Sequence, residues 1–445
     1  MSRSPETVHR PTFPWPENIL GPRPGLKEIN VLCWAMFCLC VVAPACIALT
    51  IQYKQGDLYF NKTPVDFIYF YGTGQIANTH PPMDIYNYDL QLAKFNSIRT
   101  VKDGVYGRAP YPPFVPEFFR IFANLSFDKA FLLWVSISLL LYLSGLWILL
   151  KEFFPEDRLI RSVTLCFALA FAPFLMSTLS NGQLSSIALF FTSVAIVQER
   201  RGRFVLSGLA LSVLTYKFTL LVWAIPMLLL TRRFKTLGGF AAGSGILGLI
   251  ASLFTGLEIW PVYLRFLNSF GKTTGVYGKN SIILWKYVDL NSFSYAIPGG
   301  RSRIALVLMG CMVIAIVSWL VVVLWRSANG DRRQQTLAWS VAILWTMLAN
   351  VYYPNYDSVL LVPAVVVCLS ALRERQWRGA LNLVVTLSIV TFAIGWFTEP
   401  LAKRYGVQLL TLAIMSLAVT ATYLLQRISA GQPSVAPLTS VAQAG

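Results

Sequence analysis

Apolar residues occur along this chain in uncharged runs of about 20, the length that a helix needs to cross the hydrocarbon core of a bilayer. The uncharged stretch 162–198 is too long for one span, and its run Ser180-Asn181-Gly182-Gln183 suits a turn between helices at about 162–179 and 184–198. Residues 356–372 suffice for one short span. The pattern therefore predicts an all-α integral membrane protein. Further spans are predicted at about 29–53, 130–150, 236–256, 304–325, 334–352, 379–397 and 405–426.

The run 204–231 has two interpretations, because Lys217 stands in its middle. It is either one long span or a hairpin of two short helices. Short loops rich in Lys and Arg stay on the cytoplasmic side of a membrane. All basic loops lie on one side of the membrane only under two conditions. The run 204–231 must cross the membrane outward and then cross it back, and the proline-rich stretch 113–126 must lie on the surface or be re-entrant. This choice predicts twelve spans with both termini cytoplasmic. The basic loops are 151–161, 200–203, 232–235, 326–333 and 373–378.

This topology divides the chain into a cytoplasmic tail at 1–28, a membrane domain at 29–427 and a disordered cytoplasmic tail at 428–445. Two outer segments are long, at about 54–128 and 257–303. Long loops in a compact body are usually functional, so we expect the chemistry on the extracytoplasmic face.

Composition supports a chain whose main solvent is lipid, since 56% of the residues are hydrophobic and 13% are charged. A net charge of +17 would suit a nucleic-acid partner, but the Lys and Arg residues are dispersed among membrane connectors, so we expect no nucleic acid. The seven cysteines fall in apolar spans, and the chain has two histidines and no clustered carboxylates. We therefore expect neither a metal site nor another cofactor.

Several short motifs follow one another in a characteristic order over roughly 60–370. They are Asp66-Phe67 with Tyr69 and Tyr71, Asp84-Ile85-Tyr86, Tyr111-Pro112-Pro113, Asn181-Gly182-Gln183, Gly208 with Lys217, and Asn280-Ser281. The series resembles the polyprenol-phosphate-dependent enzymes of glycosyltransferase family 87, which include mannosyltransferases of phosphatidylinositol mannoside synthesis. The resemblance implies a GT-C type multi-span bundle with juxtamembrane helices in its outer loops and a lipid-phosphate sugar as donor.

The resemblance makes Asp66 the candidate general base. Sugar transfer to a hydroxyl with inversion needs a carboxylate that takes the acceptor proton. The lipid tail keeps the donor in the bilayer, and Asp66 lies about 13 residues after the first span, among aromatic side chains typical of the membrane interface. The alternative is an Asp that caps a short helix or pairs with a lysine.

Lys217 is the first candidate for the donor phosphate. Each arm of a hairpin at 204–231 would rise about 20 Å, which leaves the turn below the outer surface. A lysine there is costly unless it meets an anion. The alternative is a lysine that snorkels to the headgroups. Lys279 is a second phosphate candidate, and Lys272 and Arg265 are weaker ones.

Further polar and aromatic residues are predicted to converge on the outer face and to contact sugar hydroxyls or stack on the sugar. Ordinary turn chemistry is the alternative, above all for Asn181-Gly182. Related enzymes often have a histidine where this chain has Asn355, so no histidine role is expected there. These substrate-binding candidates are Tyr69, Tyr71, Asn181, Gln183, Asn280, Ser281, Asn355 and Tyr356.

The sequence thus predicts transfer of a sugar, with mannose the commonest in the resembling family, from a polyprenyl-phosphate donor to a lipid or glycan acceptor. The short N-terminus and the absence of retention signals indicate a bacterial plasma membrane. Two alternatives stay open: a transporter or flippase of a lipid-linked sugar, and a polymerase or ligase that moves a whole glycan.

Overall fold

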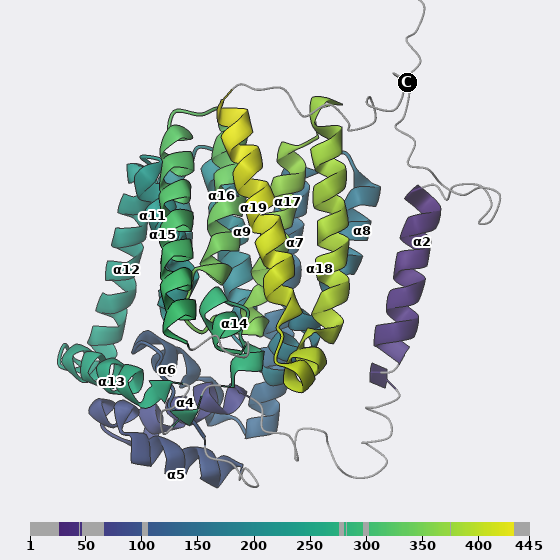
Figure 1. Ribbon diagram of the computed structural model, residues 1–445. Helices are drawn as coiled ribbons and strands as arrows, with labels where there is room; N and C mark the ends of the chain where they lie inside the picture. Colours follow the sequence, from purple (N-terminus) through teal and green to yellow (C-terminus); the bar gives the residue numbers. More distant parts are fainter. Residues whose placement is uncertain are drawn as a thin grey trace, which may run out of the picture.

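The computed structural model describes residues 26–43, 45–46, 66–99, 106–275, 280–281, 283–296, 302–373 and 375–430 of the 445. In this part of the chain nearly every element is helical, as predicted, and the long helices stand side by side in one bundle (Figure 1). A two-residue pair of strands, β1 (Thr274–Gly275) and β2 (Asn280–Ser281), is a small exception to the all-α prediction.

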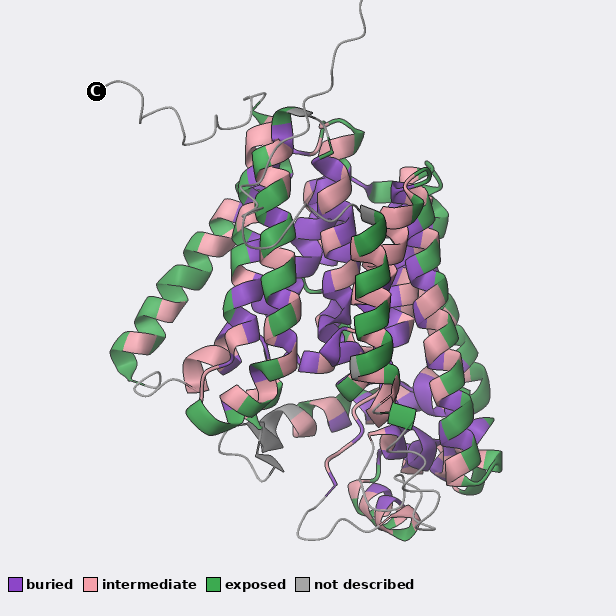
Figure 2. Cartoon of the chain, turned by 90° about the vertical axis from the view of Figure 1, so that its right-hand side faces the viewer, coloured by how far each residue is buried: buried purple, intermediate pink, exposed green. Residues whose placement is uncertain are grey.

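Five described helices are long and apolar enough to cross a membrane, and a pair bent by 50° makes a sixth. Their outward side chains are exposed apolar residues, such as Ile304, Leu308 and Ile314 of α15, whereas buried residues fill the middle of the bundle (Figure 2). Exposed apolar surface on this scale is stable only against lipid, so the fold is that of a multi-span membrane protein. The helices are α7 (Phe127–Phe153), α12 (Phe234–Thr255), α15 (Arg303–Arg326), α18 (Arg378–Tyr405), α19 (Leu409–Ser429), and the bent pair α8 (Arg158–Leu169) with η5 (Pro173–Leu179).

The other predicted spans are shorter helices, several of them enclosed by the bundle. The helix α16 (Arg332–Leu348) is buried at every position from Thr336 to Leu348, so protein rather than lipid surrounds it. An enclosed helix need not match the bilayer thickness. The remaining elements of this group are α2 (Leu26–Phe37) with the π-helix η1 (Cys38–Val42), α9 (Ser185–Arg200), α10 (Phe204–Ser212), η6 (Val213–Tyr216), η7 (Phe218–Leu221), α11 (Ala224–Leu230), η9 (Asn355–Leu360), α17 (Leu361–Ala371) and η10 (Arg375–Trp377).

The structure answers the question about 204–231 in favour of the hairpin. The helices α10 and α12 pack directly together, because Gly208 and Gly239 let the two backbones touch where any Cβ atom would collide. Gly239 lies against Val205 and Gly243 against Ser212, so both helices start at the same end and run in the same direction. The chain between them must therefore go out and return. It reverses at Lys217, which separates η6 from η7.

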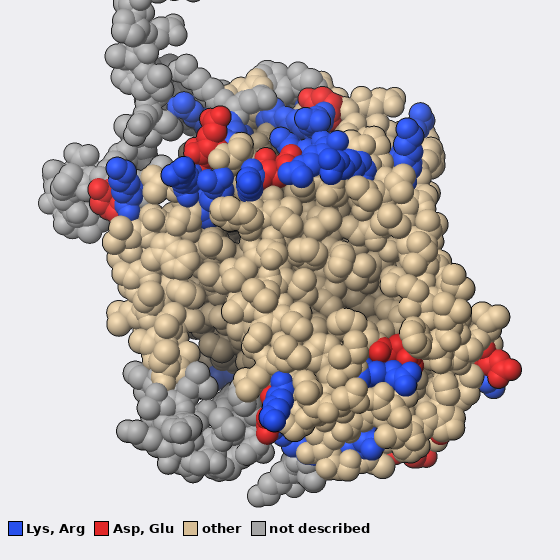
Figure 3. All heavy atoms as spheres, turned by 180° about the vertical axis from the view of Figure 1, so that it is seen from behind, with Lys and Arg blue, Asp and Glu red and all other residues tan. Residues whose placement is uncertain are grey.

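Ionic residues gather at one end of the bundle, which we call the basic end. Arg201 bonds Glu152 there, Arg373 bonds Asp157, and the buried Arg233 bonds Glu199. Figure 3 shows this belt of Lys, Arg, Asp and Glu above a broad band that carries no charge. The bare band marks the part that faces lipid.

Short helices cover the opposite end, which we call the loop end, and they lie across the long helices rather than along them (Figure 1). Ile76, Ile85 and Tyr263 share a small apolar core that packs the first outer loop against the second. The six-residue helix α6 is far too short to cross, in agreement with a surface position for 113–126. The elements are α4 (Phe67–Thr79), η3 (Pro82–Tyr86), α5 (Tyr88–Ile98), α6 (Phe114–Phe119), η4 (Phe122–Asn124), α13 (Ile259–Thr273), η8 (Leu284–Lys286) and α14 (Leu290–Ala296).

One predicted boundary is wrong. The predicted spans 379–397 and 405–426 leave a connection at 398–404, but α18 continues through this stretch to Tyr405, and the chain reverses at Gly406, whose φ is +71°. Hydropathy marks where the apolar run stops at Glu399, whereas the helix itself extends beyond the lipid. The predicted tails at 1–28 and 428–445 lie largely outside the described residues.

Candidate functional site

The candidate base Asp66 stands immediately before α4 at the loop end of the bundle. It occupies the N-cap position, yet its side chain makes no capping hydrogen bond, and no ion pair within 4.0 Å is recorded for it among the described residues. Its Oδ2 instead accepts a hydrogen bond of 2.5 Å from Nε2 of Gln183. The carboxylate is therefore held in place by a neutral partner.

The turn before α9 brings Gln183 to Asp66. Gly182 has a φ of +68°, which favours glycine, and a Cβ atom there would lie 2.8 Å from Cβ of Phe67 and 2.9 Å from the ring of Phe131. The indole N–H of Trp134 donates to the Gly182 carbonyl at 2.8 Å. The absence of a side chain at Gly182 thus allows α4 to begin directly against this turn.

The hairpin turn brings Lys217 to a second carboxylate. Its ammonium donates to Oδ2 of Asp357, a side chain that is only 1% exposed, and lies 4.6 Å from the ring centre of Tyr356. The hydroxyl of Ser185 donates to Oδ1 of Asp357 at 2.7 Å, and that of Tyr353 donates to its backbone carbonyl at 3.1 Å. Three turns that are far apart in the sequence therefore meet at one buried ion pair.

A backbone contact joins the second outer loop to the same place. The amide of Val288 donates to the Tyr353 carbonyl at 2.9 Å, and the amide of Tyr353 donates to Asp289 at 2.7 Å. Asp289 is fully buried and also accepts bonds from the amide and hydroxyl of Ser292. This docking places Lys286 and the adjacent Tyr287 at the site.

The charges around Asp66 act on it in opposite directions. Burial raises the pKa of the Asp66 carboxyl above its usual range, while Lys286, the hydrogen bond from Gln183 and Lys217 oppose that rise. Burial and the charge of Asp66 raise the pKa of Tyr287 to about 12. Asp66 itself keeps a partly exposed surface, so a substrate can reach it.

Two further tyrosines border Asp66. Burial, with the charge of Asp66 as the next cause, raises the pKa of both Tyr69 and Tyr111 above the usual range. The hydroxyl of Tyr69 accepts a hydrogen bond of 3.2 Å from the Gly107 amide. Both phenols therefore stay neutral near the carboxylate.

The remaining predicted residues differ in their placement. The Tyr71 hydroxyl donates to the Leu125 carbonyl at 2.7 Å within a buried aromatic cluster, one turn of helix beyond Asp66. Asn181 is half-buried beside Gly182. Asn355 is buried, and its Nδ2 donates to Oε1 of Glu399 at 2.9 Å.

The candidates in the second outer loop are less fully described. Lys279 lies outside the described residues, and of Asn280 and Ser281 only the backbone in β2 is described. Arg265 is exposed on α13, where its Nε donates to the Pro261 carbonyl.

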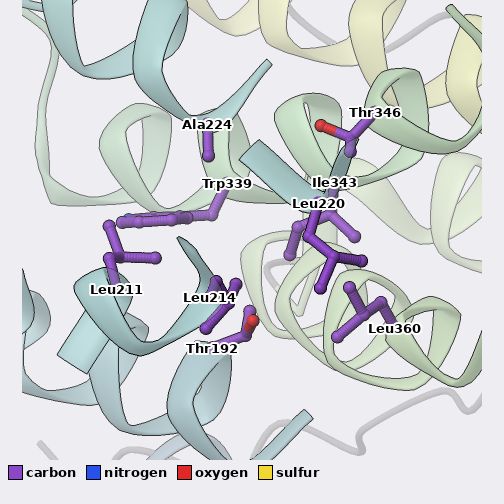
Figure 4. Close-up of a pocket in the computed structure, with 9 residues that line it drawn as sticks. All are labelled: Thr192, Leu211, Leu214, Leu220, Ala224, Trp339, Ile343, Thr346 and Leu360. Carbon is purple, nitrogen blue, oxygen red and sulfur yellow. The ribbon is translucent and has the colours of Figure 1, made fainter. Parts of the chain in front are cut away.

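The interior behind the Lys217 turn offers no room for a substrate. Leu214, Leu220 and Leu360 point together there with Thr192 and Trp339 around a small cavity (Figure 4). It has space for about one water molecule. Substrates therefore cannot reach Asp66 through this part of the interior.

Sequence reasoning missed Lys286 and gave Asp357 no specific role. The signal for Asp357 was a carboxylate next to a turn rich in tyrosine, and for Lys286 a lysine in the second long outer loop. Among the described residues, no three His, Cys, Asp or Glu side chains come together in a way that would hold a metal ion.

Comparison with known families gives one match. The model of glycosyltransferase family 87 matches residues 110–354, more than half of the chain. Gln183, Lys217 and Lys286 fall inside the matched range, and Asp66 and Asp357 lie outside it. Neither the comparison with curated proteins nor that with solved structures gives a match. With its multi-span helical bundle, the chain belongs to glycosyltransferase family 87 and is a membrane glycosyltransferase.

Proposed function

We propose that this glycosyltransferase moves a sugar from a polyprenyl-phosphate donor to a hydroxyl of a lipid or glycan acceptor, with inversion and with Asp66 as general base. The observation that carries the proposal is a carboxylate at the loop end that does not cap a helix and forms no ion pair with any described residue, while two lysines lie close enough to affect its pKa. Family membership favours catalysis over the transporter alternative.

The side of the membrane follows from charge. Short basic loops stay in the cytoplasm, so the basic end is cytoplasmic and the loop end extracytoplasmic. A polyprenyl tail would lie among the apolar faces of the long helices, with its phosphate at the level of the loop end. This arrangement fits a donor that is already activated on the lipid.

The proposed reaction is a single displacement. The acceptor oxygen attacks the anomeric carbon, Asp66 takes the proton of that hydroxyl, and the bond between the anomeric carbon and the phosphate oxygen breaks with its electrons going to the phosphate. A base is most effective when its pKa approaches the working pH, and burial raises the pKa of Asp66 toward that pH. Gln183 keeps the carboxylate oriented.

The leaving phosphate gains negative charge as that bond breaks. Lys217 and Lys286 are the cations of the site, and we assign them to this charge, with Lys279 as a further candidate. Tyr69, Tyr356, Asn181 and the other polar candidates, Tyr71, Asn280, Ser281 and Asn355, would then contact the sugar. Mannose as the donor sugar and a bacterial plasma membrane as the location belong to the same proposal.

The test is transfer from labelled polyprenyl-phosphate mannose in proteoliposomes that contain a lipid or oligosaccharide acceptor extract. Asp66→Asn keeps the size of the side chain and removes the base, so we expect transfer to fall by about 10²-fold or more. Asp89→Asn is the matched control, because Asp89 is an exposed carboxylate in the first turn of α5 at the same end.

Transfer that is lost in Asp66→Asn, with wild-type thermal stability and an active Asp89→Asn control, supports the proposal. Transfer that survives in Asp66→Asn assigns the base elsewhere. If the wild-type protein uses no polyprenyl-phosphate sugar, the proposed donor class is wrong.

A further inference from the structure

We propose that Asp357 is a positioning residue, which holds the Lys217 ammonium so that one of its N–H groups stays directed at the donor phosphate. The inference rests on the proposed function, because it concerns the same site. It adds a residue to which no role in the reaction has been given above.

The geometry shows how closely the lysine is held. An ammonium group has three donors. One is bound by Asp357, and a second faces the Tyr356 hydroxyl at 3.5 Å, while the Tyr356 ring lies beneath the nitrogen at 4.6 Å from its centre. No described residue binds the third donor, which is left for a ligand, and the lysine side chain keeps 19% of its surface exposed.

Asp357 is itself held from several sides. Ser185 at the start of α9 donates to one carboxylate oxygen, Lys217 from the hairpin turn occupies the other, and Tyr353 bonds the backbone carbonyl. Nearby, the Tyr356 carbonyl accepts a bond of 3.1 Å from Thr178. A carboxylate fixed in this way cannot follow the lysine, so the lysine must adopt the position that Asp357 sets.

The pair also sets the net charge of the site. Lys217 and Asp357 together are neutral, which leaves Lys286 to balance Asp66. When the donor bond breaks, the phosphate gains a charge, and the lysine can strengthen its bond to phosphate while Asp357 keeps it in place. A cation whose position is fixed in advance stabilises such a developing charge without reorganisation.

A purely structural role is the alternative, since a buried lysine needs an anion whatever the reaction. The two roles differ in what Asp357→Asn changes. Under the structural role, the variant loses stability, but its folded fraction binds and reacts as before. Under the positioning role, the folded fraction itself is altered.

The first readout is binding of decaprenyl phosphate to protein in nanodiscs, followed by the change in tryptophan fluorescence. We expect Asp357→Asn to weaken this binding about tenfold, and kcat/KM for the donor to fall about 10²-fold, because a misplaced group costs about that much. Asp357→Glu keeps the carboxylate and should recover part of both losses.

The second readout is the acidic limb of the pH profile, which reports on Asp66. The groups that act on Asp66 are Lys286, Gln183 and Lys217, and those on which it acts are Tyr69, Tyr111, Tyr287 and Tyr356. Asp357→Asn leaves the Lys217 charge without its balance, so ionised Asp66 is favoured and the limb moves to lower pH. Lys217→Met removes the cation and moves it to higher pH.

The matched control is Glu117→Gln, which removes a carboxylate of α6 at the same end that pairs with Arg120 and is not among the groups that act on Asp66. It is expected to lower thermal stability without moving the pH limb. If Asp357→Asn does not fold, Ser185→Ala removes one bond to Asp357 and should give smaller changes in the same directions.

Wild-type decaprenyl phosphate affinity together with an unmoved pH limb in Asp357→Asn overturns the inference. If wild-type protein binds decaprenyl phosphate but transfers no mannose from decaprenyl-phosphate mannose, the proposed function fails, and the binding measurement alone decides the role of Asp357. If wild-type protein does not bind decaprenyl phosphate, both proposals fail.

Discussion

Gly182 permits a sharp test of how the site is assembled. Gly182→Ala has two costs. A side chain at a φ of +68° costs about 1–2 kcal/mol. A Cβ atom 2.8 Å from Phe67 and 2.9 Å from Phe131 overpacks the core, which costs about 1–3 kcal/mol. We therefore expect the free energy of unfolding to fall by about 2–5 kcal/mol.

Gly202→Ala separates the two costs. Gly202 has a similar φ of +76°, but a Cβ atom there would meet nothing within 4 Å. This variant should lose only the backbone cost of about 1–2 kcal/mol. The difference between the two variants then measures the contact of Gly182 with α4 and α7.

The assay is unfolding in mixed micelles titrated with denaturing detergent, together with sugar transfer by the same samples. The folded fraction of Gly182→Ala should also transfer more slowly, because relief of the contact displaces Phe67 and hence Asp66, whereas Gly202→Ala should transfer at the wild-type rate. Equal losses of stability in the two variants, or full activity in Gly182→Ala, would refute the reasoning.

Two further predictions concern charge. Because Asp66 must be ionised to act as a base and burial raises its pKa, transfer should be lost as pH falls through a value above the ordinary 3.9 or so of an aspartate. Lys286→Ala should move this limb to higher pH, and an unchanged limb in a pH–rate series would contradict the charge assignment. At the basic end, Glu199→Gln leaves the buried Arg233 without its carboxylate and should cost about 3–5 kcal/mol in the same unfolding assay. The double variant Glu199→Met with Arg233→Met should lose less stability than Glu199→Gln. If Glu199→Gln is as stable as the wild type, the ion pair is not desolvated.

The sequence was sufficient to predict the features that hydropathy and local turn chemistry determine. The turn at Gly182 interrupts an uncharged run too long for one helix, and Lys217 interrupts another. Asp66 was singled out by its distance from the first span and by the family resemblance. These signals depend on residues near one another in the chain.

The rest of the site depends on contacts between distant segments. The pairing of Val288 with Tyr353 helps to bring Lys286 near enough to lower the pKa of Asp66, and nothing in the hydropathy of either segment specifies that pairing. The importance of Asp357 likewise emerges only once Lys217 is placed beside it. Helix ends beyond the lipid, as at Tyr405, follow hydrogen bonding rather than hydropathy.

The hairpin around Lys217 has a consequence for the biosynthesis of the protein. Each arm of 13 residues, Phe204–Tyr216 and Phe218–Leu230, rises only about 20 Å, less than the roughly 30 Å of a bilayer core. Neither arm can enter as a separate transmembrane segment, so the two must be inserted together. Lys217 then enters the membrane some 140 residues before Asp357 is synthesised, at a cost below the roughly 3 kcal/mol of a lysine at mid-membrane, because the turn lies nearer the outer surface. The hairpin can therefore reach its stable position only after the C-terminal third of the chain has been synthesised. Correct insertion of the hairpin and formation of the site are then a single late event.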